Sequence, residues 1–286
     1  MAMRTKWSIT LLAASLAASS AAQEVSLPLP TGMEIPLVLV PAGEFPMGSD
    51  EGLADQQPLH TVLLRAFYID KYEVTNAQYA EYLEDTGNLQ PGLWHEENYN
   101  QPEQPVMDLN WFDLQDFCAW AGKRLLTEAE WEKAALGTDG RRNPWGDGAV
   151  NADGVYRANY NDGGNRDADG FTFPAPVGSY PQGASPYGVH DMVGNAKEWV
   201  ADWYDGEYYA DSPASDPTGP AAGILKVLRG GSWFDFGRFA SGTYRGSFNP
   251  SLPDGDIGGR CAIDADLVNT AVQTDSWGHF KKARAD

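Results

Sequence analysis

Short apolar runs bounded by turn residues mark the predicted strands of this chain. Residues 37–40 (LVLV) end at Pro41-Ala42-Gly43, and residues 62–69 (VLLRAFYI) end at Asp70. Runs of this length and composition, followed by turn residues, are typical of β-strands. A further run at 225–228 (LKVL) predicts that regular structure resumes in the C-terminal part.

Three helices are predicted from their N-terminal caps. Thr75 with Gln78, and Thr127 with Glu130, have the spacing of a capping box, and Asn110 is a third N-cap. The apolar residues that follow recur at helical spacing and precede a glycine: Tyr79, Tyr82 and Leu83 before Gly87; Leu114, Phe117, Cys118 and Ala121 before Gly122; Trp131 and Ala134 before Gly137. Apolar residues at this spacing usually face a core, so the helices are predicted to pack inward.

The second half of the chain has a different character. Residues 139–188 and 202–223 are rich in Gly, Asn, Asp and Pro and show no sustained periodicity. Segments this long without regular structure are uncommon in compact domains, and the exceptions are functional loops. Because there is no internal repeat and no linker-like boundary, residues 37–286 are predicted to form a single domain.

The N-terminus has the pattern of a signal peptide. Arg4 and Lys6 precede an apolar stretch at 9–18, and Ser20-Ala21-Ala22 supplies small residues for cleavage before Gln23. We therefore expect residues 1–22 to be removed and 23–36 to form a short leader. The apolar stretch is short for a membrane span, although a retained membrane anchor is the alternative. The mature protein is expected to be periplasmic or secreted, with no membrane insertion after cleavage.

Charge and cysteine content narrow the possible partners. The chain has 40 acidic and 20 basic residues, a net charge of −20, which disfavours binding to nucleic acid and anionic lipid. Such a surface suits calcium-binding loops or simply solubility. In an oxidising compartment the two cysteines, Cys118 and Cys261, would most simply form one disulfide. Two unrelated buried thiols are the alternative.

Five segments, in order, resemble the formylglycine-generating-enzyme (sulfatase-modifying factor) family. They are 40–48 (VPAGEFPMG), 72–79 (YEVTNAQY), 120–132 (WAGKRLLTEAEWE), 188–199 (GVHDMVGNAKEW) and 229–233 (RGGSW). The resemblance covers about 37–264. It implies an α+β fold, a complex variant of the C-type-lectin fold with little regular secondary structure, stabilised by calcium. It also implies a disulfide between Cys118 and Cys261, because both match paired positions of the family.

The resemblance implies two sets of calcium ligands. The first loop set comprises the side chains of Asp191 and Glu198 with the backbone oxygens of Gly194 and Ala196. The second loop set comprises the side chains of Asn159 and Asp169 with the backbone oxygens of Tyr160 and Phe171. These are the hard oxygen ligands that calcium prefers. Gly194 also suits a chain that must turn sharply around an ion.

The copper site of the family is missing from this sequence. Its two cysteines lie three and eight residues beyond the Ser of the Gly-Gly-Ser segment, where this chain has Asp235 and Ala240. Neither residue supplies the thiolate that Cu(I) prefers, so no copper and no copper-dependent formylglycine generation are expected. The iron-dependent sulfoxide synthases of the family use three His in an added helical domain. Here His60, His95, His190 and His279 are scattered.

The resemblance also places a substrate cleft in the C-terminal part. Candidate catalytic residues are Ser232, Asp235, Arg238 and Arg245, and candidate substrate-binding residues are Trp199, Trp233 and Tyr244. A carboxylate beside guanidinium groups could orient a peptidic substrate or transfer a proton. In the alternative interpretation, the tryptophans are core residues and the charged residues pair with one another. Gly259, where relatives often have Phe, suggests an altered or more open cleft wall.

Two functions follow from these expectations. The first is an oxidoreductase: a copper-independent maturation enzyme for a peptide or small peptide-derived substrate, similar to the family's periplasmic branch that matures the siderophore pyoverdine. The second is a non-catalytic, calcium-stabilised lectin-like module that binds peptide or glycan. Family membership alone does not decide between them.

Overall fold

The computed structural model describes residues 24–268, apart from the side chain of Arg238. The expected signal peptide at 1–22 lies outside the described residues. Within them, no helix is both long and apolar enough to span a membrane.

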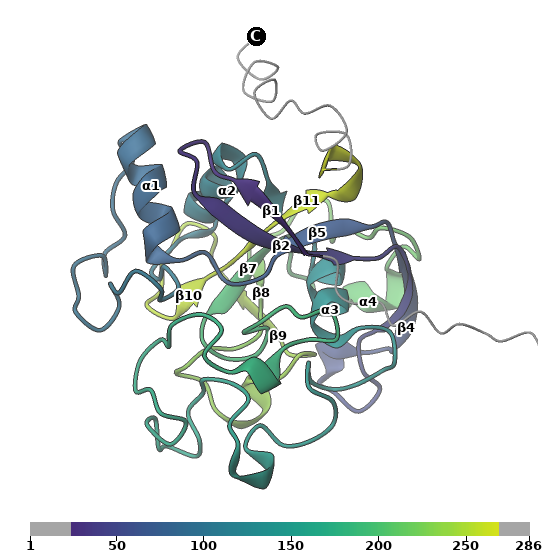
Figure 1. Cartoon of the computed structure of the whole chain (residues 1–286). Helices are drawn as coiled ribbons and strands as arrows, with labels where there is room; N and C mark the ends of the chain where they lie inside the picture. Colours follow the sequence, from purple (N-terminus) through teal and green to yellow (C-terminus); the bar gives the residue numbers. More distant parts are fainter. Residues whose placement is uncertain (1–23, 269–286) are drawn as a thin grey trace, which may run out of the picture.

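A five-stranded antiparallel sheet lies at the centre of the molecule (Figure 1). Its order is β1 (Glu24–Pro28), β2 (Glu34–Val40), β5 (Phe67–Asp70), β11 (Cys261–Asp264) and β6 (Arg124–Leu125). The predicted strand at 37–40 is thus the end of β2. Residues 24–36, expected to form a short leader, supply β1 and the start of β2 and so are part of this sheet.

A second sheet and a hairpin complete the β-structure. The second sheet has the order β10 (Ile257–Gly258), β7 (Lys197–Trp203), β8 (Lys226–Arg229) and β9 (Arg245–Phe248), with β10 parallel to β7. The hairpin pairs β3 (Gly43–Met47) with β4 (His60–Leu64). The single strand predicted at 62–69 is therefore divided between β4 and β5, because the chain passes from the hairpin to the central sheet at residues 65–66.

The three predicted helices are confirmed, with their caps. They are α1 (Asn76–Thr86), α2 (Trp111–Trp120) and α3 (Glu128–Leu136), with Thr75, Asn110 and Thr127 as N-caps. The short α4 (Tyr208–Asp211) and the 3₁₀ turns η1 (Ala54–Gln56), η2 (Ala152–Gly154), η3 (Pro181–Gly183) and η4 (Gly237–Phe239) lie in the irregular segments. The long teal loops between α3 and β7 in Figure 1 match the predicted irregular region.

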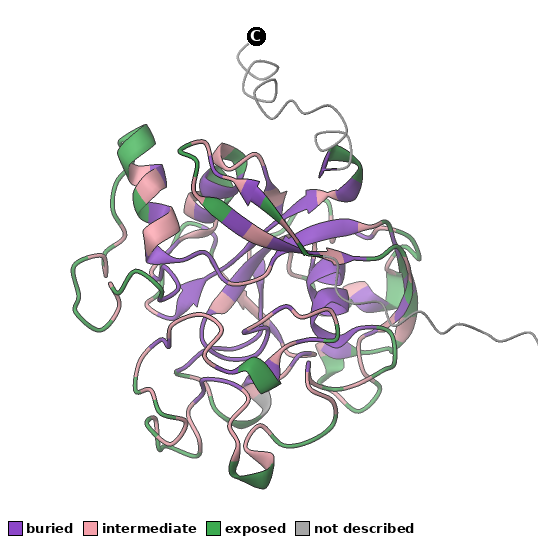
Figure 2. Ribbon diagram, viewed as in Figure 1, coloured by how far each residue is buried: buried purple, intermediate pink, exposed green. Residues whose placement is uncertain are grey.

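The helices differ in how they meet the core. Helices α1 and α2 pack through one aromatic face, in which the rings of Tyr79 and Phe117 stack at 5.6 Å between centroids. Every residue of α3 is buried. In Figure 2, α3 and the sheets are mostly buried, whereas the far end of α1 and the outer loops are exposed.

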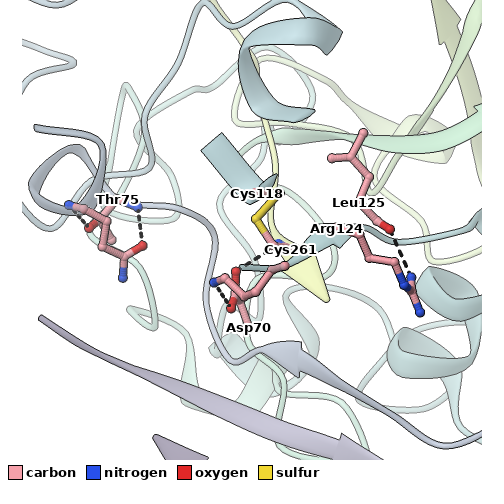
Figure 3. Close-up of a disulfide and its surroundings, with 8 residues drawn as sticks. Asp70, Thr75, Cys118, Arg124, Leu125 and Cys261 are labelled. Atoms are coloured by element: carbon pink, nitrogen blue, oxygen red, sulfur yellow. Dashed lines mark hydrogen bonds and ion pairs between the residues drawn. A yellow bond between two sulfur atoms is a disulfide. The ribbon is translucent and has the colours of Figure 1, made fainter. Parts of the chain in front are cut away.

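The disulfide Cys118–Cys261 is confirmed, with 5.7 Å between the two Cα atoms, so the alternative of two unrelated thiols is wrong. It joins α2 to strand β11 of the five-stranded sheet (Figure 3). Asp70 accepts a hydrogen bond from the Cys261 N–H at 2.9 Å and pairs with Lys123 Nζ at 2.6 Å. The disulfide and this buried ion pair therefore lie together where helix α2 meets the sheet.

Candidate functional site

Backbone hydrogen bonds bring three distant segments together at one end of the second sheet. The Lys197 N–H donates to the Asp256 carbonyl at 2.9 Å, which places the residue before β10 beside the start of β7. The Trp233 N–H donates to the Asn195 carbonyl at 3.0 Å, which places the segment after β8 against the same loop. The three segments together position every residue of the candidate site.

The Gly-Gly-Ser segment fits only because it contains glycine. Gly231 has φ +72°, and a Cβ at this residue would lie 2.3 Å from the carbonyl oxygen of Phe239. A side chain here would collide with backbone, which cannot move away without disturbing η4. The close approach buries Ser232 completely and turns its hydroxyl toward two carboxylates.

Ser232, Asp235, Asp256 and Lys197 form a compact polar cluster, called here the Ser232 cluster. The Ser232 Oγ lies 2.7 Å from Asp256 Oδ2 and 3.1 Å from Asp235 Oδ2. The Lys197 Nζ lies 2.7 Å and 3.0 Å from the same two oxygens. Two carboxylates thus share one ammonium group and one hydroxyl.

The charges of this cluster suit proton transfer. Burial lowers the pKa of Lys197, but Asp256 and Asp235 together outweigh burial and raise it, so the ammonium form persists at neutral pH. The contacts of the cluster engage the Oδ2 atoms of the two carboxylates. Both carboxylates are therefore held through their Oδ2 atoms, and a carboxylate has further lone pairs that can accept from a ligand.

Aromatic side chains line one side of the cluster. Trp233 is 5% exposed, and its ring lies 5.3 Å from that of Phe173 and 6.1 Å from that of Tyr99. Phe234 and Phe236, on either side of Asp235, are 47% and 56% exposed. The site therefore combines the largely buried polar groups of the Ser232 cluster with the exposed rings of Phe234 and Phe236.

Trp199 and Arg245 lie elsewhere, which corrects the expected lining of the cleft. Trp199 is fully buried and donates its indole N–H to the Leu109 carbonyl at 2.9 Å. Arg245 forms a two-point ion pair with Glu128, at 2.7 and 2.9 Å, and stacks on Tyr209. The core interpretation therefore holds for Trp199, whereas Arg245 pairs with Glu128 of α3, a residue outside the candidate set.

The other candidate residues have no contact with the Ser232 cluster among the interactions described for residues 24–268. Tyr244 packs against Phe239, 5.2 Å between ring centroids, and Arg238 lies in η4 with a side chain outside the described atoms. Gly259 does not open a cleft wall, because a Cβ there would lie 2.3 Å from Leu114 Cδ2. Ala240 is buried against Ala158 and Tyr160. With both cysteines in the disulfide, the chain has no free thiolate for copper.

Sequence reasoning missed Lys197 and Asp256. A weak signal existed for Lys197, a lone cation at the start of an otherwise largely apolar run (197–203, KEWVADW) inside a family segment. Asp256 gave none, because it reaches the site only through the pairing of β10 with β7.

The second loop set fits a calcium ion. Asn159 Oδ1 is buried and has no hydrogen-bond partner among the described residues. The Asp169 carboxylate lies against the same backbone, accepting from the Tyr160 and Phe171 N–H groups at 2.7 and 3.0 Å. Burial raises the pKa of Asp169. An unsatisfied buried amide oxygen and a partly buried carboxylate held by the same loop are donors that calcium could complete.

The first loop set fits less well. Gly194 has φ +78°, as a sharp turn requires, and Asp191 is buried. However, both oxygens of Glu198 already accept from Arg260, and one also accepts from Trp131 Nε1 at 2.8 Å. The guanidinium therefore occupies the position in which a cation would be held by this carboxylate.

Glu73 is a further buried acid beside the first loop set that sequence reasoning missed. It accepts from Asn195 Nδ2 and the Ala196 N–H at 2.6 and 2.9 Å. Burial, followed by the charge of Asp191, raises its pKa. Among residues 24–268, no three His, Cys, Asp or Glu side chains gather closely enough to hold a metal by themselves. Calcium would depend on amide and backbone oxygens.

Known proteins resemble this chain along most of its length. A family model described as the sulfatase-modifying factor enzyme 1-like domain matches residues 23–265. The formylglycine-generating enzyme of Streptomyces coelicolor is 36% identical over 287 residues, covering 81% of this chain and 90% of the relative. The solved structure of PvdO from Pseudomonas aeruginosa matches with a TM-score of 0.70 and 30% identity, covering 84% of this chain and 98% of that one. Treponema denticola variable protein 1 shares the fold, with a TM-score of 0.70 and 22% identity over 84% of this chain and 99% of that one.

Proposed function

Because this chain belongs to the sulfatase-modifying factor enzyme 1-like family, we propose that it is a copper-independent oxidative maturation enzyme acting at the Ser232 cluster. One observation carries the proposal. Asp235 matches a copper-binding cysteine of the family, and here it shares Lys197 with Asp256. The position is thus equipped for moving protons instead of binding a soft metal.

The cluster can divide the work of an oxidation. An Oδ1 atom of Asp235 or Asp256 takes a proton from the substrate, and the Lys197 ammonium stabilises the resulting anion. If that anion is conjugated, it can pass two electrons to dioxygen. Dioxygen takes up the proton held by the carboxylate and a second proton released by the substrate as it is oxidised, and leaves as hydrogen peroxide, while the substrate gains a double bond. The Ser232 hydroxyl keeps the two carboxylates in register.

The substrate proposed is a peptide or a small peptide-derived molecule, as in the pyoverdine-maturation branch of the family. The exposed rings of Phe234 and Phe236 offer a surface for a planar group, and Lys197 with two acids offers partners for amides. Export to the periplasm or beyond is proposed from the N-terminal basic and apolar pattern.

Calcium is proposed as a structural cofactor at the second loop set. Asn159, Tyr160, Asp169 and Phe171 would hold it, and the ion would supply charge compensation to a loop that has little regular structure. The role is to hold loop 159–171 in place beside the cluster, since the Asn161 N–H donates to the Asp235 carbonyl at 2.9 Å.

A non-catalytic binding module is the second candidate. It is favoured by the buried indole N–H of Trp233, which has no acceptor among the described residues and would gain one from a ligand. Binding without oxygen consumption would distinguish this function from the first.

The test is substrate-dependent oxygen uptake by the mature protein with candidate peptides and chromophore precursors. We expect uptake by the wild type and a loss of at least about a hundredfold in kcat for Lys197→Met and Asp235→Asn, typical of removing an anion-stabilising or a proton-transfer group. Lys71→Met removes a lysine that pairs with Glu24 at the start of β1, outside the Ser232 cluster. This variant is the matched control and should retain activity. No uptake with any of these substrates, or full activity in Lys197→Met, would contradict the proposal.

A further inference from the structure

Arg166 differs from most of the described arginines in that its guanidinium packs on aromatic rings. Its guanidinium lies 4.4 Å from the ring centroid of Phe234 and 5.7 Å from that of Trp233. The arginines that pair with a carboxylate are Arg65, Arg124, Arg141, Arg142, Arg229, Arg245 and Arg260. Within residues 24–268, Arg166 has no such ion pair, although the chain carries 40 acidic residues. A stacked guanidinium keeps its N–H edge available for an anion.

Trp233 supplies a second donor without an acceptor. Its Nε1 atom is buried and unpartnered among the described residues, and the residue is 5% exposed. Buried indole N–H groups usually find a partner, because leaving one unsatisfied costs free energy. An acceptor brought by a ligand would remove that cost.

Tyr99 connects these donors to the Ser232 cluster. Its ring lies 6.1 Å from that of Trp233. Burial raises the pKa of Tyr99, Arg166 opposes this, and Asp256 adds to it. Tyr99 and Trp233 also pack in one cluster with Ala196, the residue before Lys197, so the Tyr99 ring lies near the Ser232 cluster.

We propose that Arg166, Trp233 and Tyr99 form an anion subsite that binds a carboxylate of the substrate next to the Ser232 cluster. The guanidinium donates two parallel hydrogen bonds, and the indole N–H and the phenol supply further donors. The exposed rings of Phe234 and Phe236 then cover a planar group attached to that carboxylate. That the bound molecule is a substrate rests on the proposed function. The subsite itself can be tested by binding alone, without turnover.

The test compares a carboxylate with its neutral amide. The probes are N-acetyl-L-tyrosine and N-acetyl-L-tyrosinamide, titrated into ¹⁵N-labelled mature protein. The indole N–H signal of Trp233 is assigned by its loss in Trp233→Phe. We expect the acid to shift this signal with a Kd at least about tenfold lower than that of the amide, the value of one charge-assisted contact.

Variants decide whether Arg166 is responsible. Arg166→Gln should abolish the preference for the acid, whereas Arg65→Gln, at an exposed ion pair with Asp216, should retain it. Equal affinity for acid and amide, an unchanged preference in Arg166→Gln, or no shift at Trp233 would overturn the subsite. These outcomes do not depend on turnover. A protein that binds the acid but consumes no oxygen would refute the enzymatic proposal alone.

Discussion

At the scale of single residues, the two positions at which the resemblance places copper-binding cysteines carry Asp235 and Ala240 in this chain. Asp235 stands where a thiolate is expected, and Lys197 and Asp256 surround it with charges that a soft metal would not need. Ser232 keeps its family position but now bridges two carboxylates. Outside the site, Asp202 is another buried carboxylate whose charge is poorly balanced by its neighbours.

Asp202 should make stability depend on pH. It is 3% exposed, and burial, reinforced by the charge of Glu128, raises its pKa to about 8 from 3.8. A folded-state pKa above the unfolded one means that the contribution of Asp202 to stability is complete below about pH 4 and is lost as the pH rises to about 8. Asp202→Asn should therefore match the wild type near pH 4 and be increasingly more stable toward pH 8, as measured by urea unfolding.

The control for this prediction is Asp211→Asn, because Asp211 is exposed at the end of α4. This variant should change the free energy of unfolding only slightly, and by the same amount at pH 4 and pH 8. A difference between Asp202→Asn and the wild type that does not change with pH would contradict the raised pKa.

At the scale of elements, α3 shows how tertiary packing overrides a local pattern. Its sequence, EAEWEKAAL, alternates charge with apolar residues, yet every residue is buried. The acids are tolerated because Glu128 pairs with Arg229 and Arg245, and Glu132 with Arg229, each at 2.7 Å. Removing one partner of such a buried pair leaves the other charge uncompensated. The stability of α3 therefore depends on its tertiary contacts as much as on its helix propensity.

The N-cap of α3 should contribute measurably to stability. Thr127 Oγ1 accepts from the Glu130 N–H at 3.2 Å, and Glu130 returns a bond to the Thr127 N–H at 2.9 Å. Thr127→Ala should lower the free energy of unfolding by about 1 kcal/mol, because an N–H of the first turn loses its acceptor. Thr127→Ser keeps the hydroxyl and should cost less than half as much in the same urea titration. Equal losses in both variants would mean that the methyl group, not the cap, matters.

At the scale of the whole molecule, the disulfide links segments that are far apart in the sequence, and side-chain hydrogen bonds hold the long loops. Cys118 and Cys261 are 143 residues apart and join the helical half to the central sheet (Figure 3). The loops between α3 and β7 contribute few regular hydrogen bonds and are held by side chains such as Asn195, which bridges Glu73 and Ala175.

Removing the disulfide should destabilise the protein strongly. Cys118→Ala with Cys261→Ala should lower the free energy of unfolding by about 4–5 kcal/mol, because the unfolded chain gains the entropy of a long open loop. Reducing the wild type should lower it by a similar amount. Two reactive thiols in unfolded, unreduced protein would show that the bond does not form.

Calcium removal should lower the melting temperature if the second loop set is occupied. A chelator should destabilise the wild type, and Asp169→Ala should be less stable and insensitive to the chelator, because the ligand is gone. Asp167→Asn, an exposed acid in the same loop, should remain sensitive. No effect of the chelator on the wild type would contradict the site, and elemental analysis would check calcium content directly.

The sequence by itself determined the features that depend on neighbouring residues. Thr75, Asn110 and Thr127 identified the helices because a cap acts within one turn, and the apolar run at 37–40 identified the end of β2. The resemblance to the family, with Asp235 and Ala240 at its cysteine positions, likewise led to the expectation of no thiolate site there.

Only the tertiary structure decided which distant residues meet. Lys197 and Asp256 join the site because β10 pairs with β7, a contact that no local pattern encodes. Trp199 and Arg245 leave it because Leu109 and Glu128 satisfy their polar groups inside the core. Local signals arise from backbone geometry within a few residues, whereas a site depends on long-range pairing and on which buried charges find partners.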